Sequence, residues 1–345
     1  MINDNVIGVI IAGAVRHAAD YAPLIVKHPQ LTLLGIAEEL NSESWKIDMA
    51  KKLARKLDLP FYNLESGLDL VNCNLVLINT EPTRHASVAK LALMAGKNVL
   101  VDKPVATCRS EAEELANLAE DTGLIATYFH RLFSPETQRL HNAIANGSIG
   151  LPLTLDLTWI SNNSLDDEGG DIIIDKAISG GGEIRNFLGY PLDLALWLTG
   201  LKPLSLFANS TFRTASEHAK FGVENLATIV LQFESEVRVS ITVGRGAPVG
   251  KGIFTSTISG SHGYISVKEN RTGFEITSAP NSFSAFSSNR DDSFSLNFNS
   301  LLNNLIESIK GGENLLRSLS DGCYLAYIID CACESATTQR TVLIR

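Results

Sequence analysis

The chain has 345 residues, of which 45% are hydrophobic and 19% charged, and its 29 basic and 38 acidic side chains give a formal net charge of −9. This length predicts about two domains with a core each, and the apolar content is too high for a disordered chain. The sequence holds no run of about 18 apolar residues, so a membrane span is not expected. The acidic balance argues against nucleic acid as a partner, because phosphates require a basic surface.

The five cysteines are odd in number and form no CxxC pair. Neither a disulfide framework nor a structural zinc site is expected, and a reducing cytoplasm fits this pattern. Near the N-terminus, Ala12-Gly13-Ala14 resembles a signal-peptidase site, but the residues before it carry only Asp4 and no positive charge. The apolar run Val6–Val15 therefore predicts a buried strand.

The first third of the chain alternates short apolar runs with longer segments of helical spacing. The predicted strands are Val6–Ile11, Leu31–Ala37, Leu75–Ile78, Asn98–Val101 and Leu124–Thr127. The predicted helices are Ala18–Lys27, Ser42–Leu57, His85–Ala95 and Ser110–Thr122. This alternation predicts a parallel sheet with helices on both faces, as in a Rossmann fold.

After about residue 127 the pattern changes. Predicted strands alternate apolar and polar residues, as expected of an antiparallel sheet with one wetted face: Leu151–Trp159, Leu204–Arg213, Asn225–Phe233, Val237–Val243, Ile253–Ser259 and Gly263–Lys268. Helical spacing marks Ser134–Asn146, Tyr190–Leu198, Leu296–Ser308 and Ser320–Thr337, and Ser278–Asp292 has the composition of a loop. We expect an α/β protein with domains at residues 1–127 and 128–345, in which the C-terminal helix is free to pack back on the first domain.

The turn after the first strand is the candidate phosphate-binding loop. The dinucleotide fingerprint is Gly-x-Gly-x-x-Gly, whereas this chain has Ala12-Gly13-Ala14-Val15-Arg16-His17, with one glycine displaced by one position. Alanine is small enough to permit a close approach, and Arg16 can pair with a phosphate oxygen. The alternative is a strand that simply turns into a helix, with Arg16 a solvated charge.

Glu38 follows the second predicted strand, where an acidic side chain accepts hydrogen bonds from the adenosine ribose. Glu38 and Glu39 would repel a 2′-phosphate, and the sequence shows no Arg or Lys close behind them. NAD is therefore favoured over NADP. The alternative is a solvated carboxylate at a strand end.

Two further segments lie beyond the carboxyl ends of predicted strands, where open α/β sheets bind ligands. The first contains Asn79, Thr80, Pro82 and His85, and the second contains Asp102 and Lys103 before a proline. A lysine in such a turn can donate to a substrate oxygen.

Several collinear motifs resemble those of one known family. The stretch from Ala92 to Pro104, ALMAGKNVLVDKP, resembles "AL.AGK.VL.EKP", with Asp102 in place of Glu. Tyr128–Pro135 (YFHRLFSP) resembles "Y..RF.P", and Ile144–Leu151 (IANGSIGL) resembles "I..G.IG". Gly180-Gly181-Gly182, Tyr190, Asp193 and Trp197–Gly200 follow the pattern of a substrate-site helix. The chain thus resembles the Gfo/Idh/MocA oxidoreductases, the glucose–fructose oxidoreductase and inositol dehydrogenase group.

The resemblance implies a Rossmann domain, a C-terminal α/β domain whose open, mostly antiparallel sheet forms a homodimer or homotetramer interface, and hydride exchange between NAD or NADP and a sugar or cyclitol. Carried over by position, Lys103 contacts the reacting oxygen and the nicotinamide ribose. Tyr190 transfers the proton, and Lys103 helps because a phenol is unreactive at its ordinary pKa near 10. The implied substrate contacts are Lys103, Arg131, Asn186 and Tyr190, and no metal is implied.

The chain departs from the family at several of these positions. The usual Asp four residues before the acid/base position is Asn186, and the usual Gly two residues before it is Leu188. Glu183 and Arg185 are charged where small or apolar residues are common. A second hypothesis is therefore a catalytically silent relative that binds a ligand or cofactor as a regulatory or scaffold subunit. Asp166-Asp167-Glu168 is interpreted as a solvated acidic loop and not as a metal site.

Overall fold

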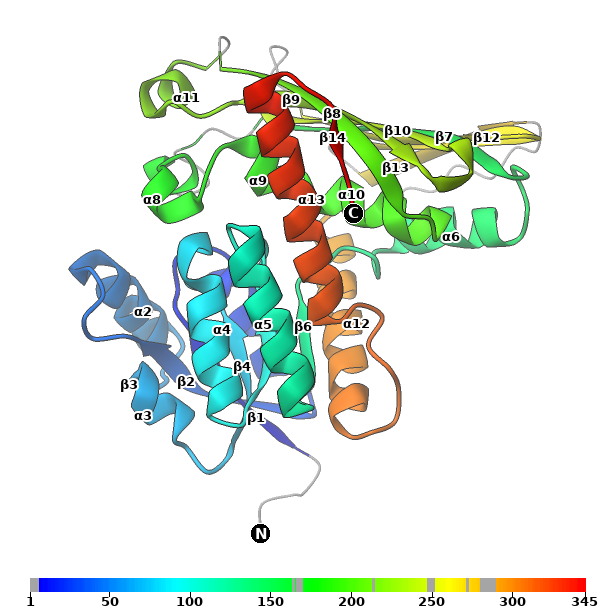
Figure 1. Ribbon diagram of the computed structural model, residues 1–345. Helices are drawn as coiled ribbons and strands as arrows, with labels where there is room; N and C mark the ends of the chain where they lie inside the picture. Colours follow the sequence, from blue (N-terminus) through cyan, green and yellow to red (C-terminus); the bar gives the residue numbers. More distant parts are fainter. Residues whose placement is uncertain are drawn as a thin grey trace. The chain divides into compact units, whose positions relative to one another are not determined.

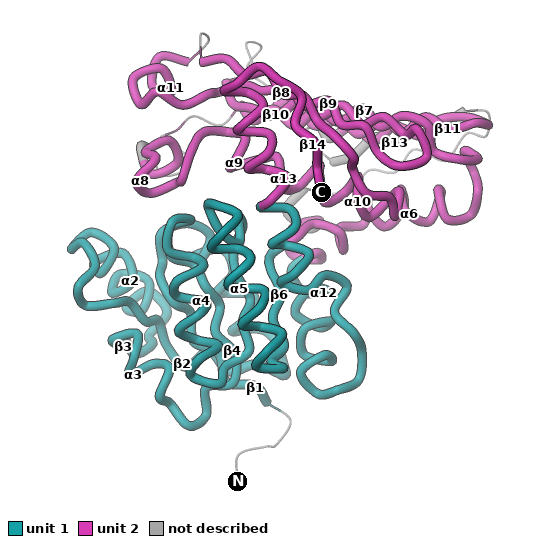
Figure 2. Tube along the Cα trace, in the orientation of Figure 1, with its two compact units in different colours: residues 1–129, 298–326 teal, residues 130–297, 327–345 magenta. Residues whose placement is uncertain are grey.

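The computed structural model describes residues 6–162, 165, 170–212, 215–246, 252–270, 273–279 and 290–345. The chain divides into two compact units, residues 1–129 with 298–326 and residues 130–297 with 327–345 (Figure 2). One unit contains a six-stranded sheet and the other an eight-stranded sheet. The α/β class predicted from the sequence is confirmed.

The six-stranded sheet of the first unit is parallel throughout, with strand order β3-β2-β1-β4-β5-β6. Its strands are β1 (Ile7–Ala12), β2 (Leu31–Glu38), β3 (Phe61–Asn63), β4 (Cys73–Ile78), β5 (Asn98–Val101) and β6 (Ala126–Tyr128). Every residue of β1 is buried, as expected for a central strand covered by helices on both faces. Because all six strands run the same way, their carboxyl ends lie at one edge of the sheet.

Helices connect these strands and cover the sheet. They are α1 (Ala18–Lys27), α2 (Ser44–Lys56), α3 (Leu64–Leu68), the 3-10 helix η1 (Pro82–Arg84), α4 (His85–Met94) and α5 (Arg109–Thr122). Helices α4 and α5 lie side by side over one face (Figure 1). Residues 298–309 of α12 (Arg290–Ile309) and 319–326 of α13 (Leu319–Thr338) also belong to this unit. The ring of Phe298 stacks on that of Tyr21 with centroids 4.5 Å apart, which fixes α12 against α1.

The second unit contains the mostly antiparallel sheet. Its strands are β7 (Pro152–Ser161), β8 (Pro203–Thr211), β9 (Leu226–Phe233), β10 (Arg238–Arg245), β11 (Ile253–Gly260), β12 (Gly263–Asn270), β13 (Gly273–Ala279) and β14 (Val342–Leu343). Their order is β13-β12-β11-β7-β10-β9-β8-β14, and β7 and β10 form a parallel pair. In β9, Ala227, Ile229 and Leu231 are buried while Val230 between them is 48% exposed. The alternation of apolar and polar residues in the sequence therefore corresponds to a sheet with one packed face and one open face.

The helices of this unit include α6 (Pro135–Ala145), η2 (Gly170–Ile173), α8 (Lys176–Ser179), α9 (Glu183–Phe187), α10 (Gly189–Thr199), α11 (Ser216–Phe221) and η3 (Glu234–Glu236), with the remaining residues of α12 and α13. Leu188 joins α9 to α10 with helical backbone angles, φ −58° and ψ −32°. None of the helices in the described ranges combines the length and hydropathy that crossing a bilayer needs.

Most differences from the predicted elements concern short or terminal segments. The predicted strand Leu124–Thr127 begins two residues later, because Gly123 ends α5 with a φ of +64° and a turn follows. Helix α12 begins at Arg290, six residues before its predicted start. Within the predicted loop Ser278–Asp292, residues 278–279 end β13, residues 290–292 begin α12, and 280–289 lie outside the described residues. Strand β3 was missed because three residues are too few to show a period.

Candidate functional site

The predicted cofactor residues of the first unit gather at the carboxyl edge of the parallel sheet. Ala12 ends β1 and Glu38 ends β2, while Asn79 directly follows β4 and Asp102 directly follows β5. The topology therefore brings together segments that are far apart in the sequence. This edge is where open α/β sheets bind ligands.

The turn between β1 and α1 depends on Gly13, whose φ is +84°. A side chain at this position would place its Cβ 2.6 Å from the backbone nitrogen of Thr80. The Gly13 N–H donates to Ala37 O at 2.8 Å, and the Val15 N–H donates to Asn79 O at 3.1 Å. The single glycine of the loop is thus required by the chain's own close packing, and the turn is tied to the ends of β2 and β4. Helix α1 begins at Ala18, so its N-terminal N–H groups follow this turn.

Asp102 is a buried carboxylate, 1% exposed, whose two oxygens have partners on three segments. Oδ2 lies 2.7 Å from His17 Nδ1 and accepts from the Asn79 side chain at 3.3 Å. Oδ1 accepts from the Tyr21 hydroxyl at 3.2 Å and from the Lys103 N–H at 2.8 Å. Burial alone would raise the pKa of Asp102, but the charge and hydrogen bond of His17 outweigh it and hold this pKa well below its usual range. Asp102 stays ionised and joins the turns after β1, β4 and β5.

His85 joins the same turns through its ring. Its Nδ1 lies 2.6 Å from Pro104 O and its Nε2 lies 3.0 Å from Thr80 O, and the residue is 1% exposed. Burial lowers the pKa of His85 below its ordinary 6.5, although the Asp102 carboxylate and the two carbonyl groups act in the opposite direction. His85 therefore fixes the turn that carries Lys103.

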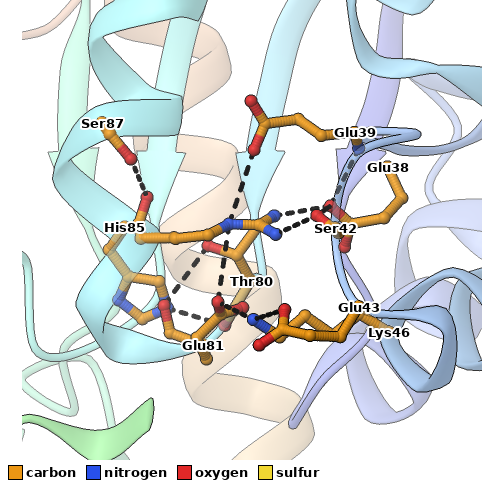
Figure 3. Close-up of polar contacts among 10 residues, drawn as sticks. Glu38, Glu39, Ser42, Glu43, Lys46, Thr80, Glu81, His85 and Ser87 are labelled. Atoms are coloured by element: carbon orange, nitrogen blue, oxygen red, sulfur yellow. Dashed lines mark hydrogen bonds and ion pairs between the residues drawn. The ribbon is translucent and has the colours of Figure 1, made fainter. Parts of the chain in front are cut away.

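Glu38 is itself buried and lies in a cluster of charged side chains (Figure 3). Its Oε1 accepts from the Glu39 N–H at 2.9 Å, from the Ser42 hydroxyl at 3.2 Å and from Arg84 Nη2 at 2.5 Å. The sequence shows no Arg or Lys close behind Glu38, but in the fold Arg84 reaches it from η1, 46 residues further along the chain. We refer to the Glu38 cluster as the set Glu38, Glu39, Ser42, Glu43, Lys46, Glu81 and Arg84.

A second carboxylate, Glu81, shares the cations of this cluster. Lys46 Nζ lies 2.5 Å from Glu81 Oε1 and 2.6 Å from Glu43 Oε2, and Arg84 Nε lies 3.5 Å from Glu81 Oε1. Burial lowers the pKa of Arg84, but the charge of Glu81 and the bond to Glu38 more than offset this, so the net shift is upward. Four carboxylates thus face two fixed cations.

Two oxygens of the Glu38 cluster lack a partner. Glu38 Oε2 and Glu81 Oε2 are buried, and no donor among the described residues reaches either of them. A buried carboxylate oxygen without a donor is costly, whereas a hydroxyl donor would satisfy it. Glu38 occupies the strand-end position that binds the ribose of a dinucleotide. The residues present therefore fit NAD: the turn from Gly13 to His17 for the pyrophosphate, and Glu38 for the ribose hydroxyls.

In the second unit, Arg131 lies beside Tyr190. The Arg131 guanidinium carbon lies 6.0 Å from the Tyr190 ring centroid and 5.5 Å from that of Trp159. The rings of Trp159 and Tyr190 have centroids 5.8 Å apart at 30°. Tyr190 is half-buried. A phenol and a cation are thus fixed side by side on an aromatic support, and Trp159, which the sequence analysis did not select, forms that support.

Asn186 lies in a cluster of buried polar side chains. Its amide donates to Glu183 Oε2 at 2.8 Å, while Glu183 Oε1 accepts from Arg245 Nε at 2.7 Å and lies 3.1 Å from His218 Nε2. Burial would raise the pKa of Glu183, but His218, Arg245 and Asn186 together lower it below its ordinary value. The side chain of Leu188 is 1% exposed. The helical backbone at Leu188 explains why a glycine is not needed at this position.

Two further sequence predictions concern the convergence of Lys103 with Tyr190 and the acidic segment 166–168. Lys103 belongs to the first unit and Tyr190 to the second, so their convergence stays a prediction. Asp166, Asp167 and Glu168 lie outside the described residues. Within the described part of the chain, no group of three His, Cys, Asp or Glu side chains is arranged to hold a metal ion.

The family assignment comes from comparison with known proteins. Residues 7–130 match the model described as the oxidoreductase family with an NAD-binding Rossmann fold, and residues 137–266 match the model of the GFO/IDH/MocA C-terminal domain. Both predictions from the sequence, the family and the NAD-binding domain, are confirmed.

The individual relatives with long matches share only a low sequence identity with this chain. The trans-1,2-dihydrobenzene-1,2-diol dehydrogenase of Macaca fuscata fuscata is 24% identical over 226 residues, which are 63% of this chain and 62% of that protein. An uncharacterized oxidoreductase of Synechocystis is 24% identical over 249 residues, 71% of this chain and 64% of the relative. Across the first curated relatives the matched region spans between 25% and 64% of their length.

Solved structures share the fold over nearly the whole chain. Levoglucosan dehydrogenase in complex with NADH and L-sorbose has a TM-score of 0.82 at 20% identity, covering 98% of this chain and 99% of that one. GenD2 from gentamicin A biosynthesis, in complex with NAD, has a TM-score of 0.83 at 18% identity, covering 99% and 97%. With both halves matched by family models and the fold shared throughout, the chain belongs to the GFO/IDH/MocA family of oxidoreductases.

Proposed function

We propose that this protein is an oxidoreductase that transfers a hydride between a nicotinamide and a secondary alcohol or ketone of a sugar, cyclitol or related polyol. The observation that carries the proposal is the buried Glu38 carboxylate at the end of β2, whose Oε2 has no donor among the described residues. Of NAD and NADP we favour NAD, because the Glu38 cluster already has more carboxylates than cations and would repel a 2′-phosphate. The solved relative that binds NADH and L-sorbose supports the substrate class.

In this mechanism residues 1–127 bind the cofactor, and residues 128–345 form the substrate-binding domain. The nicotinamide, when bound, supplies the hydride chemistry. Lys103 contacts the reacting oxygen, and Tyr190 exchanges the hydroxyl proton. Arg131, stacked over the rings of Trp159 and Tyr190, stabilises negative charge as the phenol loses its proton. Arg131 and Asn186 are the further proposed substrate contacts.

The test combines binding and turnover. Isothermal titration with NAD, NADH, NADP and NADPH is followed by assays on a panel of sugars, cyclitols and diols. Lys103→Ala should lower kcat/KM by roughly 100-fold or more while thermal unfolding stays near that of the wild type. The control is Lys90→Ala. Lys90 lies on α4 and pairs with Glu114 of α5. An unchanged kcat/KM in Lys103→Ala would refute the proposed role.

A second candidate function is a catalytically silent relative that acts as a regulatory or scaffold subunit. The replaced positions of the glycine loop, Ala12 and Ala14, and the untitratable Asn186 favour it. A ligand that binds only the native state raises stability by RT ln(1 + [L]/Kd). Absence of any thermal shift with all four dinucleotides at millimolar concentration would support the silent function and exclude the oxidoreductase.

We also propose that the protein forms a homodimer or homotetramer through the open face of the eight-stranded sheet, in the cytoplasm. On this face Phe207 and Val230 are cross-strand neighbours with exposed fractions of 37% and 48%. The five cysteines, all free of disulfides, suit a reducing compartment. Sedimentation should show an oligomer that Phe207→Asp weakens. A wild-type monomer at high micromolar concentration would contradict this.

A further inference from the structure

The single positive charge of Arg84 is shared among three carboxylates. Its Nη2 lies 2.5 Å from Glu38 Oε1, and its Nε lies 3.5 Å from Glu81 Oε1 and 3.6 Å from Glu39 Oε2. Its Nη1 also donates to the Ser42 hydroxyl. The Nε is buried but forms no hydrogen bond with any described residue. Three carboxylates therefore hold Arg84, and the shortest of these three contacts is to Glu38 Oε1.

This bond determines which oxygen of Glu38 is available. Oε1 accepts from Glu39, Ser42 and Arg84, so its capacity is used. Oε2 has no donor among the described residues. Without Arg84, the carboxylate would lose the charged partner that it has among the described residues and could rotate to share the remaining donors between both oxygens. Arg84 thus keeps one oxygen occupied and the other without a partner.

We propose that Arg84 is a specificity-determining residue for the adenosine end of the dinucleotide. It holds Glu38 so that Oε2 accepts the ribose hydroxyls of NAD. When the Glu38 carboxylate is removed, the guanidinium, together with the Ser42 hydroxyl, becomes a ligand for the 2′-phosphate of NADP. This inference rests on the proposed function, because it assumes that the chain binds a dinucleotide.

The experiment is a double-mutant cycle measured by isothermal titration with NAD and with NADP. Arg84→Met should weaken NAD binding about tenfold, a loss of about 1.4 kcal/mol, and in turnover the loss should appear in the KM for NAD more than in kcat. Glu38→Ala should lower NAD affinity and raise NADP affinity at least about tenfold. The double variant Glu38→Ala/Arg84→Met should lose that gain, because the phosphate then has no guanidinium to bind.

Arg109→Met is the matched control, since Arg109 is an exposed arginine of the same unit that pairs with Glu113 on the surface of α5. Its NAD and NADP affinities should equal those of the wild type. If Arg84→Met fails to fold, Arg84→Lys keeps the charge but loses the two-pronged contact with Glu38 and Ser42, and should bind NAD with intermediate affinity.

The outcomes separate this inference from the proposed function. A wild-type protein that binds no dinucleotide overturns both. A wild-type protein that binds NAD, with equal affinity in Arg84→Met and Arg84→Lys, overturns the role of Arg84 alone. An NADP gain in Glu38→Ala that survives in the double variant also overturns it, because the phosphate would then be held by other groups.

Discussion

Two buried carboxylates lie at the same edge of the parallel sheet, and their surroundings differ. Asp102 and Glu38 are each 1% exposed. Each oxygen of Asp102 has two partners, whereas Glu38 has three donors on Oε1 and none among the described residues on Oε2. Burial therefore does not distinguish the two carboxylates. The distribution of donors does.

The difference separates a structural group from a ligand-binding one. A carboxylate whose hydrogen bonds are all made within the chain holds loops together, and removing it leaves buried donors unpaired. A carboxylate with a buried oxygen that accepts no hydrogen bond within the chain can accept one from a ligand. On this comparison we expect Asp102 to position the residues around the proposed cofactor site and Glu38 to contact the cofactor itself.

The largest effect is expected from Asp102→Ala. It leaves His17, Asn79 and the Lys103 N–H without their common acceptor, which should reduce the free energy of unfolding by about 3–5 kcal/mol. Urea denaturation followed by circular dichroism measures it. Asp102→Asn, which keeps two of the four partners, should lose less. A loss below about 1 kcal/mol in Asp102→Ala would mean that the two carboxylates do not differ in this way.

Glu38→Ala provides the contrast. It removes a carboxylate from a cluster with excess negative charge, and Arg84 keeps Glu39 and Glu81 as partners. Its free energy of unfolding should fall less than that of Asp102→Ala, while NAD binding falls. Equal destabilisation by Glu38→Ala and Asp102→Ala would remove the basis of the comparison.

An intermediate effect is expected from Gly13→Ala. The substitution combines a positive φ with a Cβ 2.6 Å from the Thr80 nitrogen, so the turn must move away from the end of β4. A destabilisation of about 1–3 kcal/mol is expected, together with weaker dinucleotide binding. Gly96→Ala serves as control, because it also has a positive φ but no atom within 4 Å of the added Cβ. Similar losses in both variants would show that φ alone, and not the close approach, matters.

The smallest effect is a pH dependence from His85. Its pKa is lowered in the folded state by burial, so above pH 6.5 the imidazole is neutral in both states and stability is complete. As the pH falls below 6.5 the unfolded chain takes up a proton that the folded chain does not, and stability is lost. Urea midpoints between pH 7.5 and 5 should fall more in the wild type than in His85→Gln. Parallel curves would contradict the assignment.

Much of the fold could be predicted from the sequence because its signals are local. The apolar run of β1 and the alternation of β9 each reveal a strand by the burial of its own residues. The displaced glycine loop and Glu38 could be located because both follow predicted strands. Strand β3 and helix α9 were missed, since elements of three and five residues hold too little pattern.

The candidate site could be predicted only in part, because the residues that contact one another in it are distant in the sequence. Arg84 lies beside the predicted His85, yet its contact with Glu38 depends on β1 lying between β2 and β4 in the sheet. The position of Trp159 beside Tyr190 depends equally on the packing of α10 against β7. Such contacts follow from topology, which spacing along one chain does not encode.

The buried Glu183 has a consequence for how this sequence can change during evolution. It is fully enclosed and neutralises Arg245, which is 3% exposed, while also contacting His218. A mutation of Glu183 to a small or apolar residue would remove a carboxylate partner from the buried Arg245 guanidinium, and a mutation of Arg245 would remove a cationic partner from the buried Glu183 carboxylate. These three positions should therefore be exchanged together among its descendants, and intermediates that carry only one change should be poorly tolerated.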